Sequence, residues 1–311
     1  MAQWGGICGS RLAPLANALK DFILSQGVIH ADETPVALLA PGKGKTDRAY
    51  MWVYRTTDYA EQRAVWLNFC KSRAGEHPKT VLKNYVGTLV TDDYVAYKAI
   101  YAQGKIIEAG CMAHARRKFF EAHQLTGSKI AGHAVTLIAR LYLIERETKE
   151  FDAKARQQER QSRAKPAADE LHAWLMGQRQ HLAKADASAK AIDYCLGRWR
   201  ALLRYLDDGE VPIDNNAVEN SIRPLALGRR NWLFVGSQRA GERAANIMSL
   251  IESAKLCGHD PWAYLKDVFE RLPTLKNRDL DSILPHNWRA PVPAAERVGD
   301  FAAMAQSNSA A

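Results

Sequence analysis

The chain has 311 residues, 47% of them hydrophobic, so it can bury a large core, and global disorder is excluded as a class. Its formal charge of +9 and its pI near 9.3 favour a polyanionic partner, although many basic proteins bind no nucleic acid. No apolar run reaches the roughly 18–20 residues of a membrane span and the first residues do not resemble a signal peptide, which predicts a soluble intracellular protein.

The first third of the chain carries strand patterns separated by short helical ones. Apolar residues at helical spacing predict a helix over 11–26, and a strand pattern follows at 28–40. Two β-rich runs, 49–56 and 64–69, flank a polar turn and predict a hairpin. The next predicted elements are a helix at 77–85, a strand at 87–93, a helix at 94–104 and a strand at 105–111.

Antiparallel strands followed by β–α–β units predict a mixed sheet covered by helices, which is the element order of an RNase H-like α/β core. From about residue 113 to 207 the sequence changes to helices with charged faces and apolar stripes, interrupted by a polar break at 157–166. We interpret this stretch as a large all-helical insertion that precedes Glu219.

Two further helices are predicted after the insertion. The first covers 241–258 and ends at a glycine, and the second begins with Asp260 as its N-cap. The last thirty or so residues are Pro- and Ala-rich and predict a loosely held tail. The expected parts are therefore an N-terminal helix (1–27), the first part of the core (28–112), the insertion (113–210), the return of the core with the helix of Glu219 (211–256), and a C-terminal helix with a flexible tail (257–311).

Three acidic residues are the candidate catalytic and metal-binding residues. Asp32 and Asp92 lie in or at the end of strand patterns, and Glu219 lies early in a helix rich in Asn and Arg. Three convergent carboxylates repel one another unless divalent cations lie among them, and hard oxygen ligands suit Mg²⁺ or Mn²⁺. In a basic chain, such a centre indicates metal-dependent phosphoryl transfer on nucleic acid.

Each acid also has an ordinary structural interpretation. Asp32 is a turn residue near a proline, Asp92 is a helix N-cap, and Glu219 forms an i,i+4 pair with Arg223 on a solvated face. Adjacent strand residues point to opposite faces, so only one of Asp92 and Asp93 is expected in the site, and we expect Asp92.

Basic and polar residues follow two of these elements. Cys111 and His114 form a CxxH that lacks two further zinc ligands, and His114 could instead contact phosphate or orient an acid. Arginines interleaved with aromatic residues are typical of a surface that follows a phosphate backbone and stacks a base, and a solvated basic face is the alternative. The candidate DNA-binding residues are His114, Arg116, Arg117, Asn216, Arg223, Arg229, Arg230 and Trp232.

Several segments together resemble the transposase of the insertion-sequence-66 family, a bacterial DDE transposase group. They are IHADETPV, TDDYVAY, CMAHARRKFFEAH, NNAVENSIRPLALGRRNWLFVGS and GERAANIMSLIESAKLCGHDPWAYL, and the resemblance covers about residues 10–272. It implies an RNase H-like fold in which Asp32, Asp92 and Glu219 form the catalytic triad and hold Mg²⁺, for which Mn²⁺ can substitute. It also implies DNA strand cleavage and strand transfer on double-stranded transposon ends and target, by a homo-oligomer with accessory proteins of the same element, in the bacterial cytoplasm at the nucleoid.

The sequence departs from the family pattern in two places. The usual TDGY reads TDDY, so Asp93 replaces a glycine and either alters the turn or adds an acid. The family's N-terminal zinc segment and helix-turn-helix are not found, so we expect a truncated copy or a fragment. Two alternatives stay open: a catalytically inactive DNA-binding remnant, and an RNase H-like nuclease without joining activity.

Overall fold

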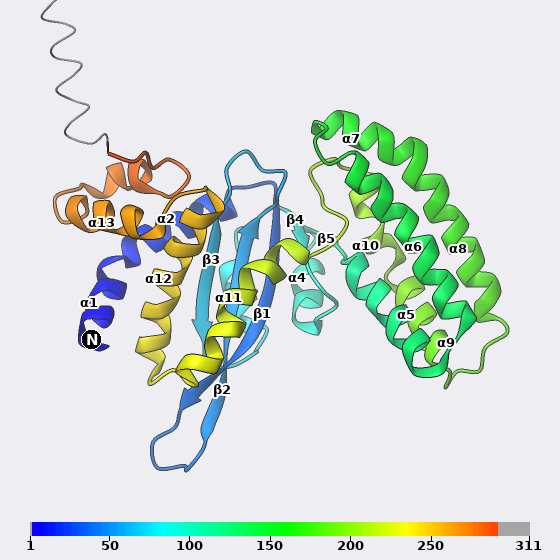
Figure 1. The fold of residues 1–311 in the computed structure, drawn as a ribbon, viewed down its shortest axis with the longest axis horizontal. Helices are drawn as coiled ribbons and strands as arrows, with labels where there is room; N and C mark the ends of the chain where they lie inside the picture. Colours follow the sequence, from blue (N-terminus) through cyan, green and yellow to red (C-terminus); the bar gives the residue numbers. More distant parts are fainter. Residues whose placement is uncertain (1, 292–311) are drawn as a thin grey trace, which may run out of the picture.

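The computed structural model describes residues 2–291, and its centre is a five-stranded mixed sheet in the order β3-β2-β1-β4-β5 (Figure 1). β1 pairs antiparallel with β2 and parallel with β4, so it lies in the middle of the sheet. The RNase H-like mixed sheet flanked by helices, as predicted from the sequence, is confirmed. The strands are β1 (Val28–Leu39), β2 (Thr46–Thr56), β3 (Val65–Cys70), β4 (Gly87–Val90) and β5 (Ile106–Ala109).

Side chains alternate between the two faces of β2, so this strand contributes to two separate hydrophobic cores. Trp52 and Tyr54 pack on one face against α2 (Ala13–Leu24), while Met51 and Val53 pack on the other. The second face is covered by α11 (Asn216–Trp232) and by α12 (Gln238–Leu256). Short elements connect the strands on the way: α3 (Glu76–Val81), the 3₁₀ turn η1 (Val95–Tyr97) and α4 (Lys98–Tyr101).

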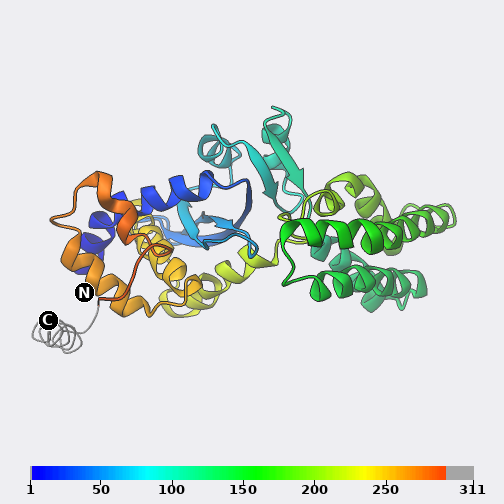
Figure 2. The ribbon, with the colours of Figure 1, turned by 90° about the horizontal axis from the view of Figure 1, so that it is seen from above.

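Between β5 and α11 the chain forms a separate group of helices at one side of the sheet (Figures 1 and 2). Their apolar stripes make a core of their own, with Phe119, Leu141, Leu171 and Ile192 buried. The elements are α5 (Met112–Thr126), α6 (Lys129–Glu147), α7 (Ala153–Glu159), the π-helical turn η2 (Arg160–Ala164), α8 (Lys165–Arg179), α9 (Ala187–Gly197), α10 (Trp199–Leu202) and the 3₁₀ turn η3 (Arg204–Leu206).

The polar break predicted at 157–166 is wrong, because the chain is helical from α7 through η2 into α8. Ala164 is fully buried, and Arg160 is fully buried in an ion pair with Glu145. A buried arginine with a carboxylate partner can sit inside a helical core, although its residue type alone indicates a surface or a loop.

The N-terminal helix begins earlier than predicted. Helix α1 (Ala2–Arg11) precedes α2, and the two meet at Leu12. α1 carries glycines that lower helix propensity, but it lies beside α12 (Figure 1), and a Cβ on Gly9 would come within 2.6 Å of the Arg243 carbonyl oxygen. Close approach of the two helices therefore explains why glycine occupies a helical position here.

The C-terminal segment is better packed than its composition indicates. Asp260 caps α13 (Pro261–Arg271) as predicted, accepting from the Ala263 N–H at 2.7 Å. A 3₁₀ segment, η4 (Asn277–Ile283), follows, and the indole of Trp288 is 2% exposed and donates to Asp267 Oδ2 at 2.7 Å. The predicted loose tail is thus wrong up to residue 291, and residues 292–311 lie outside the described part. Within residues 2–291, no helix combines the length and apolarity that a bilayer crossing requires.

Candidate functional site

Asp32, Asp92 and Glu219 come from three elements and lie close enough for the charges of Asp92 and Glu219 to act on Asp32, although in residues 2–291 their ligand atoms do not all lie within 4.8 Å of one another. Asp32 lies opposite Val53 in the β1–β2 register, and cross-strand neighbours share a face, so it points to the side covered by α11. Asp92 follows β4, the parallel neighbour of β1. Glu219 lies in the first turn of α11, directly after Val218, which is buried against the sheet.

The electrostatics of Asp32 reflect this arrangement. Burial raises the pKa of Asp32 to about 8, and the negative charges of Glu33, Asp92 and Glu219 add to the shift. A buried carboxyl group beside other carboxylates keeps its proton at neutral pH unless a positive charge compensates. A divalent cation bound beside these carboxylates would therefore stabilise the deprotonated form of Asp32.

Glu219 has oxygen atoms that protein groups leave largely free. Its ion-pair partners come from α5, with Arg117 Nη2 at 3.6 Å and His114 Nδ1 at 3.8 Å, both longer than a hydrogen bond. In the described part of the chain, Glu219 Oε1 is buried without a hydrogen-bond partner, and Glu219 makes no ion pair with Arg223. The predicted alternative of a solvated Glu219–Arg223 pair is not what the structure shows.

The donor set of this cluster fits hard divalent cations. Three carboxylates from β1, the end of β4 and α11 offer only oxygen ligands, which Mg²⁺ and Mn²⁺ prefer. Glu219 also lies near softer ligands, because Cys111, His114 and Glu219 present ligand atoms within 4.8 Å of one another. Burial raises the pKa of the Cys111 thiol to about 12, so it stays protonated at neutral pH and its Sγ accepts the Asn215 N–H at 3.2 Å.

A buried polar connection joins the start of α11 to β1, and sequence reasoning missed it. His30 and Asn215 are both fully buried, and burial lowers the pKa of His30 to about 4, so its ring is neutral. His30 Nδ1 donates to Asn215 Oδ1 at 2.7 Å, and Asn215 Nδ2 donates to the Ala31 carbonyl at 3.1 Å. These bonds fix the position of Glu219 relative to Asp32, because Ala31 directly precedes Asp32 and Asn215 lies four residues before Glu219.

The two acids next to the candidate residues have partners of their own. The Glu33 side chain is buried and paired with Arg73 at 2.5 Å, on the sheet face opposite Asp32. Asp93, which stands where the usual TDGY motif has a glycine, pairs with Arg198 at 3.0 Å and with Lys98 at 3.9 Å. Its charge is thus compensated by a residue of the helical group, and it does not add a free acid to the cluster.

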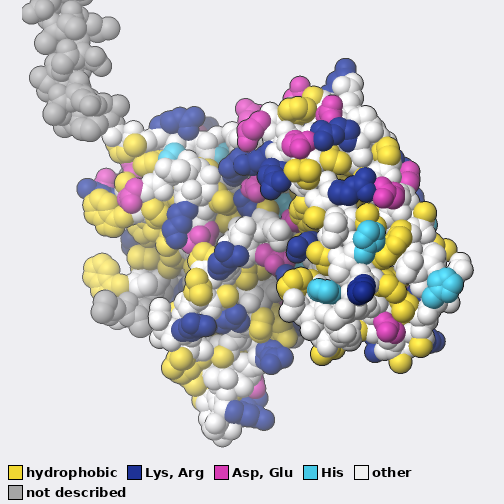
Figure 3. All heavy atoms as spheres, turned by 45° about the vertical axis from the view of Figure 1, so that its right-hand side comes forward, with side chains coloured by type: hydrophobic (Ala, Val, Ile, Leu, Met, Phe, Trp, Pro, Cys, Tyr) yellow, Lys and Arg dark blue, Asp and Glu magenta, His cyan; other side chains and the backbone are white. Residues whose placement is uncertain are grey.

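The predicted DNA-binding residues divide into two groups. His114, Arg117 and Asn216 lie beside Glu219, and Arg116 is their exposed neighbour on α5. The others follow α11 away from the acids, and Trp232 lies thirteen residues beyond Glu219, or roughly 20 Å along the helix. Figure 3 shows Lys and Arg side chains on both sides of the hollow between the sheet and the helical group, with acidic side chains inside it. The second group of predicted DNA-binding residues, which follows α11 away from the acids, consists of Arg223, Arg229, Arg230 and Trp232.

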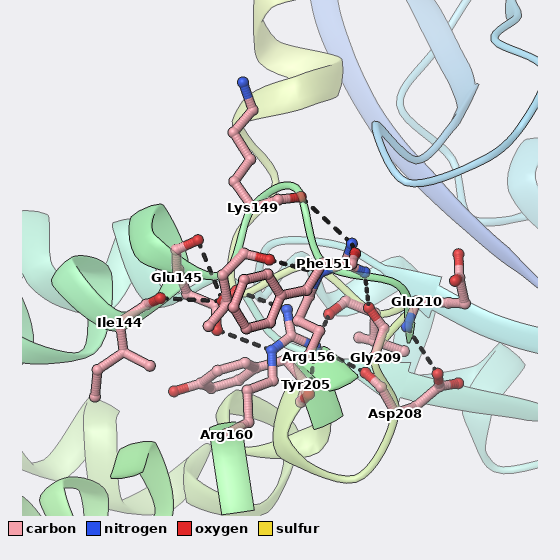
Figure 4. Close-up of polar contacts among 12 residues, drawn as sticks. Ile144, Glu145, Lys149, Phe151, Arg156, Arg160, Tyr205, Asp208, Gly209 and Glu210 are labelled. Carbon is pink, nitrogen blue, oxygen red and sulfur yellow. Dashed lines mark hydrogen bonds and ion pairs between the residues drawn. The ribbon is translucent and has the colours of Figure 1, made fainter. Parts of the chain in front are cut away.

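Two buried arginines of the helical group hold the segment that leads into α11 (Figure 4). Arg160 forms a two-bond pair with Glu145 at 2.8 and 2.6 Å. Its Nη1 also donates to the carbonyls of Tyr205, Asp208 and Val211 at 2.8–3.0 Å. Arg156 Nη1 donates to the Gly209 carbonyl at 2.6 Å, where a Cβ would overlap the Ala153 carbonyl oxygen at 1.8 Å. The helical group therefore fixes the path of the chain just before Asn215.

The raised pKa of Asp32 gives a stability prediction for the metal-free protein. An acid whose pKa is raised from about 4 to about 8 on folding binds more protons in the folded than in the unfolded chain over that interval. We expect the free energy of unfolding to fall as pH rises from about 5 to about 8, and Asp32→Asn to reduce this fall. Urea unfolding in EDTA measures it, and equal pH dependence in both proteins would contradict the placement of Asp32. Added Mg²⁺ should stabilise the unsubstituted protein most at the higher pH.

Comparison with known proteins gives the family. Residues 1–243 match the family described as "Transposase IS66 family", and residues 249–286 match "IS66 C-terminal element". Similar proteins of Sinorhizobium fredii (strain NBRC 101917 / NGR234) are the uncharacterized proteins y4jD, 39% identical over 301 residues, and y4hP, 34% identical over 310 residues. The alignments cover 92% and 93% of this chain but only 59% and 56% of those relatives, so the chain spans less than two thirds of their length. The matched segments carry all three acids of the cluster, and the chain belongs to the IS66 transposase family.

Proposed function

We propose that this chain carries the catalytic part of a DDE transposase that cleaves DNA strands and joins them to a target in a reaction dependent on Mg²⁺ or Mn²⁺. The observation that carries the proposal is that Asp32, Asp92 and Glu219 lie near one another, so that burial and the neighbouring carboxylates raise the pKa of Asp32 to about 8. Family membership supports the same reaction class.

The three carboxylates would hold the divalent cations. When bound, these ions supply Lewis acidity that makes a water or a DNA 3′-hydroxyl nucleophilic and neutralises charge on the scissile phosphate. Asp32 lies in β1 and Asp92 lies two residues after the end of the neighbouring strand β4, while Glu219 is positioned through Asn215 and His30. Rigid placement of this kind is what in-line displacement at phosphorus needs.

The basic residues would hold the DNA. Arg117 and His114 lie within 4 Å of Glu219 and would contact a phosphate beside the cations. The arginines along α11 would neutralise the backbone further from the scissile bond. Joining two transposon ends needs two active sites together, so we propose that the protein acts in the bacterial cytoplasm as a homo-oligomer on double-stranded transposon ends and target, with accessory proteins of the same element.

The test is cleavage of a supercoiled plasmid with Mg²⁺, with Mn²⁺ and with EDTA, comparing the unsubstituted protein with Asp32→Asn. We expect nicking that requires the metal and is absent from Asp32→Asn. Capture of labelled DNA ends into the plasmid then separates a transposase from a nuclease that only cuts. DNA binding without cleavage by the unsubstituted protein would overturn the proposal and favour an inactive remnant.

A further inference from the structure

A groove beside the acidic cluster has side chains that the reaction at Asp32, Asp92 and Glu219 does not use. It lies between α5 and α6 and reaches the start of α11, with a volume of about 750 Å³, within the range of about 300–1,000 Å³ that is usual for ligand pockets. We infer that this groove binds an unpaired nucleotide of the DNA strand that flanks the scissile phosphate. This inference rests on the proposed function and names where the flanking strand lies.

The groove contains positive charge that is free to bind phosphate. Arg116 and Arg146 line it and are exposed, and no ion pair involves either of them in residues 2–291. Glu121 is the one acidic residue among the lining residues. Arginine forms paired hydrogen bonds to phosphate oxygens, and two guanidinium groups without carboxylate partners suit a phosphodiester.

The groove also contains a surface on which a base can stack. Phe120 lines it and is 45% exposed, which is unusual for a phenylalanine in a helix whose other face is packed. Aromatic side chains beside arginines are the usual platform for unpaired bases in proteins that bind single strands. A paired base inside a duplex has no free face to offer Phe120, so the occupant is an unpaired nucleotide.

The groove is connected to the acidic cluster through shared residues. Arg117 lines the groove and is also 3.6 Å from Glu219. Tyr142 lines it and donates to Asp214 Oδ2 at 2.9 Å, while Asp214 accepts from the Asn216 backbone N–H at 2.9 Å, three residues before Glu219. A strand whose phosphate lies at the cluster therefore reaches the groove within a short distance.

The test compares two fluorescein-labelled DNAs, a blunt duplex and the same duplex with a short single-stranded overhang, by fluorescence anisotropy in EDTA. We expect the unsubstituted protein to prefer the overhang and Phe120→Ala to lower affinity for it by at least about fivefold, with little change for the blunt duplex. Phe120→Trp should keep the preference because it keeps the stacking surface. Arg146→Gln should weaken overhang binding. It should also reduce the magnitude of the slope of log affinity against log salt concentration by about one.

Matched controls lie outside the groove. Trp262 on α13 is an aromatic side chain that is 71% exposed, and Arg140 on α6 pairs with Glu170 at 2.7 Å. Trp262→Ala and Arg140→Gln should leave the overhang preference unchanged. No preference in the unsubstituted protein, or equal losses on both DNAs in Phe120→Ala, would overturn the inference.

Binding in EDTA keeps this result separate from the proposed function. If nicking depends on metal but Phe120→Ala binds the overhang as tightly as the unsubstituted protein, the groove is not a nucleotide site and the catalytic proposal stands. A preference that depends on Phe120, in a protein that does not nick DNA, would reject the catalytic proposal and leave the groove as a nucleotide site.

Discussion

Glu219→Gln is expected to lower metal-dependent DNA cleavage by about a thousandfold or more while DNA binding and folding stay intact. The substitution keeps the shape of the side chain and removes the charge that would hold a cation, and a loss of about 4 kcal/mol in transition-state stabilisation corresponds to this factor. Folding should not suffer, because Glu219 Oε1 makes no hydrogen bond in the described structure and its ion pairs are longer than 3.5 Å. Plasmid nicking, DNA anisotropy and urea unfolding measure the three properties.

The control for this experiment is Glu170→Gln, on the exposed side of α8, where the glutamate pairs with Arg140. It changes the net charge of the protein by the same amount and should leave nicking unchanged. If Glu219→Gln loses stability or DNA binding together with cleavage, Glu219 has a structural role, and the catalytic assignment falls.

Much of the fold follows from periodicity in the sequence. The alternation of Met51, Trp52, Val53 and Tyr54 places each residue on one of two cores, as a strand buried on both faces requires. The elements that sequence reasoning missed depend on tertiary contacts instead. Helix α1 is stable because Gly9 lets it approach α12, and such an approach leaves no periodic signal in the chain.

The acidic cluster was predictable because a carboxylate in a strand, one just after the neighbouring strand and one at the start of a helix can lie close together in an α/β fold. The structure brings Asp32, Asp92 and Glu219 together in this way, whereas their roles remain a prediction. The His30–Asn215 hydrogen bond could not be predicted, because it joins residues 185 positions apart that have no pattern in common. The Asn215–Asn216 pair at the start of α11 was the local signal, and it indicates a polar helix start without indicating which residue Asn215 contacts.

Arg160→Met is expected to lower the free energy of unfolding by about 3–5 kcal/mol, because it leaves the Glu145 carboxylate buried without its partner. The carbonyls of Tyr205, Asp208 and Val211 lose their shared donor in the same substitution. Arg163→Met is the matched control in the same turn, since Arg163 is exposed and its pairs with Glu147 and Glu159 are screened by solvent, so the loss of stability should be much smaller. Urea unfolding of both variants measures the difference.

The double variant Arg160→Met, Glu145→Leu separates the two contributions of Arg160. Replacing both partners of a buried ion pair by apolar residues removes the uncompensated charge, so most of the lost stability should return. The three carbonyls stay without their donor, and they lie on the segment that carries the chain to Asn215 and Glu219. We therefore expect the double variant to be stable and still to cleave DNA more slowly. Full recovery of both properties would mean that Arg160 acts only through its charge pair, and that the His30–Asn215 bond alone is sufficient to place α11.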